Sequence, residues 1–155
     1  MTKQQLADLI IGSKESFYRI AKSILSRDSD CEEAMSEAIV NAFTALPSLR
    51  QERYAKTWFT RILIHECYHI LHRRQYEIVY DDRLDDAQSV PTAEPSALYQ
   101  ALEQLDVRYR NALVLHYIEG YSVREIADMT DATEGTVKSR LSRGRKLLKT
   151  IYEGE

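Results

Sequence analysis

The sequence predicts an all-α protein made of two small helical domains joined by a flexible acidic linker. Apolar residues recur every three or four positions in both halves of the 155-residue chain, which is the period of an amphipathic helix. An acidic stretch that contains proline and lacks this period separates the halves. We therefore expect a first domain over residues 1–75, a linker over 76–94 and a second domain over 95–155.

Three helical segments are predicted in the first domain. The first is marked by an apolar stripe over residues 6–24, made of Leu6, Leu9, Ile10, Phe17, Ile20, Ala21 and Ile24. Asp30 is expected to cap the second helix, with Glu33 as its partner in a capping box. This helix should stop at Pro47, because the residue before a proline disfavours the helical conformation.

The third helix is predicted over about Ala55–Arg74 and has two contrasting sides. One side is apolar and carries Trp58, Phe59, Ile62, Leu63, Cys67, Ile70 and Leu71. The other carries Arg61, His65, Tyr68, His69 and His72. We expect Trp58 to lie in the core rather than to stack on a base, because it shares the apolar side with Ile62.

Charge is distributed unevenly, although the formal net charge is only −3. Residues 50–74 carry six basic and two acidic residues, whereas residues 75–95 carry six acidic residues, one basic residue and two of the three prolines. The acidic stretch is the predicted linker. A protein that binds DNA by itself normally has a basic balance, because phosphate neutralisation supplies most of its non-specific affinity.

Residues 120–149 predict a helix-turn-helix. Gly120 can end the preceding helix in the left-handed region, and Asp131 lies where the turn needs another left-handed residue. A capping box of Ser122 and Glu125 predicts a helix over about Val123–Met129, with Ile126 and Ala127 facing the core. Thr133 can cap the helix that follows.

The second helix of this unit has an apolar and a basic side. Its apolar residues are Val137, Leu141, Gly144, Leu148 and Ile151. Six basic residues and one acid lie between residues 134 and 149. The residues expected on or beside the exposed side are Lys138, Ser139, Arg140, Ser142, Arg143, Arg145 and Lys146. Alone, such a face fits an ordinary solvated helix, but with the turn and both caps it indicates a helix that enters the major groove of DNA.

Composition excludes several classes of protein. No apolar run approaches the length of a membrane span, and the first five residues do not open a signal peptide. Cys31 and Cys67 fit neither a disulfide framework nor a C-x-x-C site, so we expect reduced thiols in the core. These features predict a cytoplasmic protein without membrane insertion.

Residues 65–69 spell H-E-x-x-H, which is the zinc metallopeptidase motif with two histidine ligands and a glutamate base. His72 extends the same side of the helix. A three-helix domain leaves little material for a substrate cleft, so we expect no catalytic metal and no cofactor. Adventitious metal binding, contact with DNA and simple exposure to water stay open for these histidines.

Together these segments resemble the bacterial RNA polymerase sigma factors of the extracytoplasmic-function type, which keep only sigma domains 2 and 4. DCEEAMSEAIVNAF, residues 30–43, resembles their polymerase-binding segment. WFTRILIHECYHILHRR, residues 58–74, resembles the segment that opens and reads the upstream edge of the start-site bubble. LDVRYRNALVLHYIEGYSVREIADMTDATEGTVKSRLSRGRKLL, residues 105–148, resembles domain 4.

The resemblance implies three binding surfaces. The clamp helices of core RNA polymerase would be bound by Asp30, Glu33 and Glu37, although a capped, solvated helix would explain the first two equally well. The promoter −10 element would be bound by the loop over 47–54 and the helix after it, through Arg50, Arg53, Lys56, Arg61, His65, His69, Arg73 and Arg74. The −35 element would be bound by Thr136, Lys138, Ser139, Arg140, Ser142, Arg143 and Lys146.

The chain departs from the family pattern at His65 and His69, where the family commonly has Asn and, four residues later, Asp. The resemblance also implies an anti-sigma factor as a partner and no catalytic activity. A stand-alone helix-turn-helix regulator is the alternative, which the acidic net charge disfavours. A zinc metallopeptidase is the remote alternative.

Overall fold

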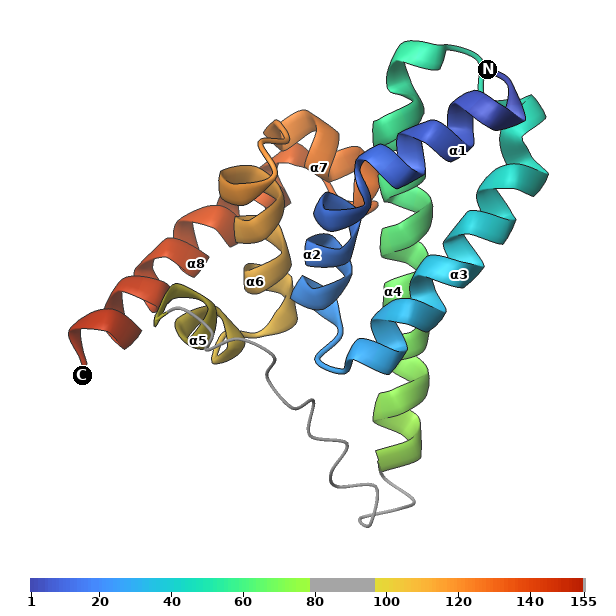
Figure 1. The fold of residues 1–155 in the computed structure, drawn as a ribbon. Helices are drawn as coiled ribbons and strands as arrows, with labels where there is room; N and C mark the ends of the chain where they lie inside the picture. Colours follow the sequence, from blue (N-terminus) through green and yellow to red (C-terminus); the bar gives the residue numbers. More distant parts are fainter. Residues whose placement is uncertain (79–96, 155) are drawn as a thin grey trace. The chain divides into compact units, whose positions relative to one another are not determined.

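The computed structural model describes residues 1–78 and 97–154, which form two compact helical units (Figure 1). All elements within these ranges are helices, which confirms the predicted all-α class. The predicted linker lies outside the described residues from residue 79 onward. Its first three residues, 76–78, belong to a helix instead.

The first unit contains four α-helices: α1 (Lys3–Gly12), α2 (Lys14–Ile24), α3 (Asp28–Ala45) and α4 (Ala55–Ile78). Two 3₁₀ turns connect the last two: η1 (Leu46–Ser48) and η2 (Glu52–Tyr54). The predicted apolar stripe over residues 6–24 is divided between α1 and α2, because the poor helix former Gly12 ends α1. Helix α4 begins where predicted but continues past Arg74, since no proline or glycine interrupts it there.

The core of the first unit forms where α2 and α3 pack on α4. The rings of Phe17 and Phe59 are both fully buried, with centroids 4.6 Å apart. The buried stripe of α4 continues from Phe59 through Leu63, Cys67 and Ile70. The core placement of Trp58 was wrong, because Trp58 is only half-buried. It lies one residue, about 100° of helix rotation, before the centre of that stripe.

Both cysteines lie in this core as free thiols, as predicted. Burial raises the pKa of the Cys31 thiol to about 12 and that of Cys67 further still. Because the thiolate is the reactive form, neither sulfur is suited to nucleophilic or redox chemistry at neutral pH.

The second unit contains α5 (Ala97–Glu103), α6 (Val107–Leu113), a π-helical turn η3 (Val114–Ile118), α7 (Val123–Met129) and α8 (Glu134–Glu153). Helix α8 packs against α6 and α7 (Figure 1). A Cβ atom on Gly144 would lie 3.2 Å from Leu113 Cδ1 and 3.3 Å from Tyr109 Cβ. The missing side chain at Gly144 therefore lets α8 approach α6 closely.

The turns of the helix-turn-helix are those predicted. Gly120 and Asp131 have φ values of 79° and 52°, in the left-handed region. Ser122 and Glu125 form the reciprocal capping box of α7, and the Thr133 hydroxyl accepts a hydrogen bond from the Thr136 amide. Ile126 and Ala127 are buried as expected. The direction in which α8 leaves the turn is thus set by local geometry.

A polar network joins the end of α2 to the start of α3. Asp28 Oδ1 accepts hydrogen bonds from Lys22 Nζ and from the Tyr18 hydroxyl, both at 2.6 Å. The hydrogen bonds from Lys22 and Tyr18 hold the pKa of the Asp28 carboxyl below its usual value. Burial and the bond to Asp28 raise the pKa of the Tyr18 phenol. The ionised carboxylate therefore stabilises the α2–α3 connection.

We predict that this network makes the stability of the first unit sensitive to acid. A carboxyl whose pKa is lowered by folding stabilises the folded state above its unfolded pKa of about 3.9, and the contribution disappears as pH falls through the folded value. Asp28→Asn should reduce the loss of stability below about pH 4. Asp8→Asn, which removes an exposed carboxylate of α1, is the matched control. Equal acid sensitivity in both variants, measured by urea unfolding, would contradict this.

Candidate nucleic-acid interface

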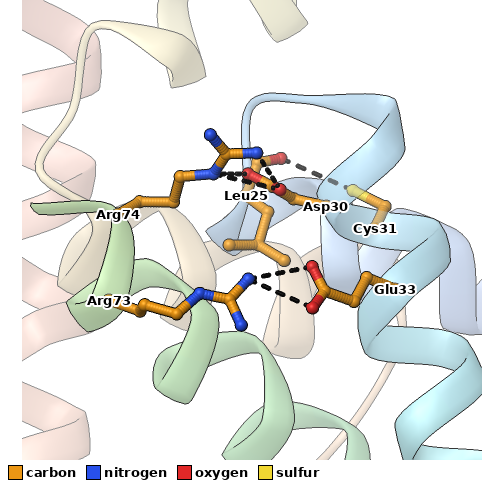
Figure 2. A network of polar contacts seen from close by, with 6 residues as sticks. All are labelled: Leu25, Asp30, Cys31, Glu33, Arg73 and Arg74. Atoms are coloured by element: carbon orange, nitrogen blue, oxygen red, sulfur yellow. Dashed lines mark hydrogen bonds and ion pairs between the residues drawn. The ribbon is translucent and has the colours of Figure 1, made fainter. Parts of the chain in front are cut away.

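Two arginine–carboxylate pairs join α3 to the C-terminal part of α4 (Figure 2). Arg74 donates to Asp30 from Nε, at 3.0 Å to Oδ2, and from Nη2, at 2.7 Å to Oδ1. Arg73 Nη2 lies 2.9 Å from one oxygen of Glu33 and 3.1 Å from the other. The Asp30 side chain is only 6% exposed, whereas that of Glu33 is 43% exposed. We call these four residues the α3–α4 clasp.

The clasp corrects the predicted role of Asp30 as a helix cap. Helix α3 begins at Asp28 with Arg27 in the cap position, so Asp30 lies inside the first turn. Its carboxylate is bound by an arginine 44 positions along the chain, a contact that no local sequence pattern reveals. Asp30 is also buried rather than part of an exposed acidic face. Glu37, by contrast, is exposed as expected.

The predicted −10 cations fall into two groups. Arg50, Arg53 and Lys56 are exposed in the connection before α4 and in its first turn. The Arg53 guanidinium lies 4.8 Å from the centroid of the Tyr54 ring, which is itself 53% exposed. Arg73 and Arg74 belong instead to the clasp. Both arginines are thus engaged with carboxylates of α3, Arg74 in a mostly buried pair and Arg73 in a half-exposed one.

The polar side of α4 carries the histidine motif. His65 and His69 are exposed, and Arg61 is half-buried on the same side. The motif's glutamate, Glu66, accepts a hydrogen bond from Asn41 Nδ2 at 2.6 Å, so it is tied to α3. Among residues 1–78 and 97–154, no three His, Cys, Asp or Glu side chains gather as a metal site would need. This arrangement gives no support to a metallopeptidase centre.

Helix α8 presents the predicted basic face. Thr136, Lys138, Ser139, Arg143 and Lys146 are exposed, while Arg140 and Ser142 are half-buried beside them. No side chain in the described part of the chain pairs with those of Lys138, Arg143 or Lys146. The apolar stripe is turned the other way, with Val137, Leu141 and Gly144 buried. This face is thus available to anionic groups.

A groove beside α8 includes residues that the sequence analysis missed. Arg108 and Tyr109 of α6 line it together with Thr136, Ser139 and Arg143 of α8. Arg108 Nε lies 3.0 Å from Asp106 Oδ1, and hydrogen bonds from Arg108 lower the pKa of that carboxyl. The sequence indicates where Arg108 lies in its helix, because Asp106 two residues earlier can cap α6 and puts Arg108 in the first turn. Only the close packing of α6 on α8 places it in the groove.

Arg145 differs from the other basic residues of α8. Its Nη1 donates a hydrogen bond to the Tyr117 hydroxyl at 2.7 Å, which connects α8 to the π-helical turn η3. It does not line the groove beside α8. Arg145 is therefore a basic residue of α8 that lies outside the groove, and its substitution can serve as a control for substitutions of the groove residues.

Comparison with known proteins identifies both units. Residues 13–76 match the family model described as Sigma-70 region 2, and residues 96–148 match the model described as Sigma-70, region 4. The RNA polymerase sigma factor SigV of Bacillus subtilis is 30% identical over 151 residues, which cover 96% of this chain and 91% of that protein. The ECF RNA polymerase sigma factor SigM of Mycobacterium tuberculosis is 32% identical over 137 residues, 84% of this chain and 68% of that protein.

Solved structures show the same fold. The sigma factor RpoE, crystallised in complex with the anti-sigma factor NepR from Bartonella quintana, superposes with a TM-score of 0.81 at 22% identity, covering 97% of this chain and 98% of that one. No helix within the described ranges is both long and apolar enough for a bilayer crossing. The chain belongs to the extracytoplasmic-function RNA polymerase sigma factors, which bind core RNA polymerase and direct promoter-specific initiation of transcription.

We predict that the two pairs of the clasp contribute very unequally to stability. Asp30→Ala removes the buried carboxylate that binds the Arg74 guanidinium, 26% exposed, and should destabilise the first unit by about 3 kcal/mol or more. Glu33→Ala breaks a half-exposed pair and should cost less than about 1 kcal/mol. Trp58 is the only tryptophan of the chain, so its fluorescence during urea unfolding reports on this unit alone. Equal losses in the two variants would show that burial does not set the strength of the pairs.

Proposed function

We propose that this sigma factor divides promoter recognition between its two units. Residues 1–75 act as sigma domain 2, which binds core polymerase and the −10 element, and residues 95–155 act as sigma domain 4, which binds the −35 element. Residues 76–94 serve as the linker. The observation that carries this proposal is the exposed basic face of α8, where described residues leave Lys138, Arg143 and Lys146 unpaired beside a groove.

The −35 element is bound by α8 in the major groove. Thr136, Ser139 and Arg143 line the groove beside α8, and Ser139, Ser142, Arg143 and Lys146 line the concavity that adjoins it. Arginine can pair bidentately with a guanine edge, whereas a lysine near the end of the contact is better placed for a phosphate. Arg143 is therefore the principal base-reading residue, with Lys138, Arg140 and Lys146 as positioning contacts. Arg108 adds a cation from α6.

Core polymerase is bound by the exposed side of α3. Glu37 and the half-exposed Glu33, whose carboxylate is also bound by Arg73, provide an acidic surface suited to a basic partner. Val40, 61% exposed on the same helix, adds an apolar side chain to this surface. Asp30 contributes indirectly, by holding α3 on α4 through Arg74.

The −10 element is bound by the connection before α4 and by the polar side of α4. Arg50, Arg53 and Lys56 neutralise phosphates, and Arg61, His65 and His69 face the strand. Arg73 and Arg74 are both engaged with carboxylates of α3, and the mostly buried pair of Arg74 supports this surface by keeping α3 and α4 together. Stacking platforms for unpaired bases are usually aromatic. The half-exposed Trp58 and the exposed Tyr54 are placed to serve as such platforms.

Membership of the sigma-factor family also suggests how this protein is regulated and where in the cell it acts. The solved structure named above is a sigma factor in complex with an anti-sigma factor. A second similar structure, CnrH, was solved in complex with the cytosolic domain of CnrY. We infer that an anti-sigma factor also binds this chain. The protein acts in the cytoplasm, where the polymerase is, and catalyses no reaction of its own.

The decisive experiment is run-off transcription with purified core polymerase on genomic templates, with and without the protein. Specific transcripts should appear only when the protein is added, and their 5′ ends will map its promoters. DNA binding by the protein without polymerase, combined with no specific transcript on any template, would favour the stand-alone regulator.

We predict different consequences for two basic residues of α8. Arg143→Ala should relax base preference at one or two −35 positions, with a loss of about 1–3 kcal/mol of discrimination. Lys146→Ala should weaken binding to all sequences about equally and lower the salt slope by roughly one. Arg145→Ala, which removes the bond to Tyr117, is the matched control and should leave base preference unchanged. A panel of −35 variants in a holoenzyme binding assay measures all three; an unchanged preference in Arg143→Ala would make Ser139 or Arg140 the better candidate.

A further inference from the structure

The polar side of α4 carries two exposed histidines one helical turn apart. His65 and His69 are separated by four positions, and both are exposed. Side chains at this spacing lie on the same face of a helix, with their Cβ atoms about 5–6 Å apart. Because metal–nitrogen bonds are about 2.0–2.1 Å long, two imidazoles at this spacing can reach one ion, as they do in H-E-x-x-H helices. The pair is therefore a chelating arrangement on the surface of the first unit.

We propose that His65 and His69 form an exchangeable binding site for a divalent transition-metal ion of the Ni²⁺, Cu²⁺ or Zn²⁺ class. A resident metal centre needs three protein ligands, which do not gather within residues 1–78 and 97–154. Two imidazoles leave the remaining coordination positions of the ion to water, so occupancy follows the concentration of the ion in solution. The inference goes beyond the proposed function, which assigns these histidines to DNA alone.

The ligands at this site determine which ions it accepts. Glu66, the carboxylate in the same turn, accepts a hydrogen bond from Asn41 Nδ2 at 2.6 Å and is held toward α3. The thiols of Cys31 and Cys67 are buried in the core. Two imidazole nitrogens are therefore the protein's ligands, and imidazole suits Zn²⁺, Cu²⁺ and Ni²⁺, whereas Mg²⁺ and Ca²⁺ prefer oxygen. The Mg²⁺ supplied for the polymerase should leave the site unoccupied.

The other histidines of the chain differ from this pair and provide controls. His72 follows His69 by three positions, which displaces it by about 60° around the helix, whereas His65 and His69 differ by about 40°. The ring of His72 lies beside that of Tyr68, with centroids 6.2 Å apart. His116 belongs to the second unit, and its Nδ1 lies 2.8 Å from the carbonyl oxygen of Tyr121.

Calorimetric titration of the untagged full-length protein with Ni²⁺ tests the site. Two ligands on one rigid scaffold bind at least about 100-fold more tightly than one, because the second bond forms within the complex. His65→Asn and His69→Asn should therefore each weaken Ni²⁺ binding by about 100-fold, and His72→Asn should leave it unchanged. All three side chains are exposed, so circular dichroism should show equal helicity in the variants.

Three results would overturn the site. A loss in His72→Asn as large as that in His65→Asn would show that the ion is not held by the pair four positions apart. Small and equal losses in every variant, His116→Asn included, would show adventitious binding by separate histidines only. Binding of Mg²⁺ as tight as that of Ni²⁺ would contradict a site made of imidazole nitrogens.

A bound ion and the promoter should compete for these histidines. This consequence rests on the proposed function, because the nitrogens that hold the ion are those that would face the −10 strand. Coupling between two ligands is reciprocal. Promoter binding by holoenzyme at constant Mg²⁺ should therefore weaken as Ni²⁺ is added. The His65→Asn, His69→Asn double variant is the control for effects of Ni²⁺ on polymerase and should not respond.

The two measurements separate the inference from the proposed function. Specific Ni²⁺ binding by the pair, combined with an equal response of wild-type and double-variant holoenzyme to Ni²⁺, supports the metal site and contradicts the placement of His65 and His69 against DNA. Unchanged Ni²⁺ binding in both single variants, with run-off transcription intact, overturns the metal site and leaves the proposed function standing.

Discussion

The Asp30–Arg74 pair is the contact on which the first unit most depends. A buried carboxylate is tolerated only when it is paired and hydrogen-bonded, and Asp30 meets this condition through three close contacts with one guanidinium. The pair holds α3 against the C-terminal part of α4, while Phe17 and Phe59 pack toward the other end. The proposed polymerase surface on α3 and the proposed −10 surface on α4 therefore keep a fixed geometry relative to each other.

Ion pairs within the fold determine which basic residues remain accessible in this chain of acidic net charge. Several basic residues of the first unit are engaged with acids inside the fold: Lys22 with Asp28, Arg73 with Glu33 and Arg74 with Asp30. Lys14, Lys56, Lys138, Arg143 and Lys146 are left to face solvent without an ion-pair partner in the described residues. What matters for DNA is this local excess of accessible cations, because formal net charge counts paired and accessible groups alike.

In the second unit, backbone constraints rather than an ion pair fix how the helices pack on one another. Left-handed residues at Gly120 and Asp131 set the two turns that flank α7, and Gly144 permits the close crossing of α8 over α6. That crossing places Arg108 and Tyr109 beside the basic face of α8. The proposed DNA-binding groove is thus assembled by contacts on the side of α8 that faces away from it.

Sequence alone determined the features of this protein that depend on neighbouring residues. The turn at Gly120–Ser122, the capping box with Glu125, the left-handed Asp131 and the Thr133 cap all follow from local chemistry, as does the exposure of the basic face of α8. Tertiary structure decided which charged residues are structural. Asp30 does not cap α3 as predicted but binds Arg74, and Lys14 of α2 lies beside the same concavity as Lys56 of α4. The physical reason is distance along the chain. A cap or a helical stripe is encoded within a few residues, whereas a pair separated by about 40 positions forms only when packing brings two helices together, and helical periodicity carries no information about that partner.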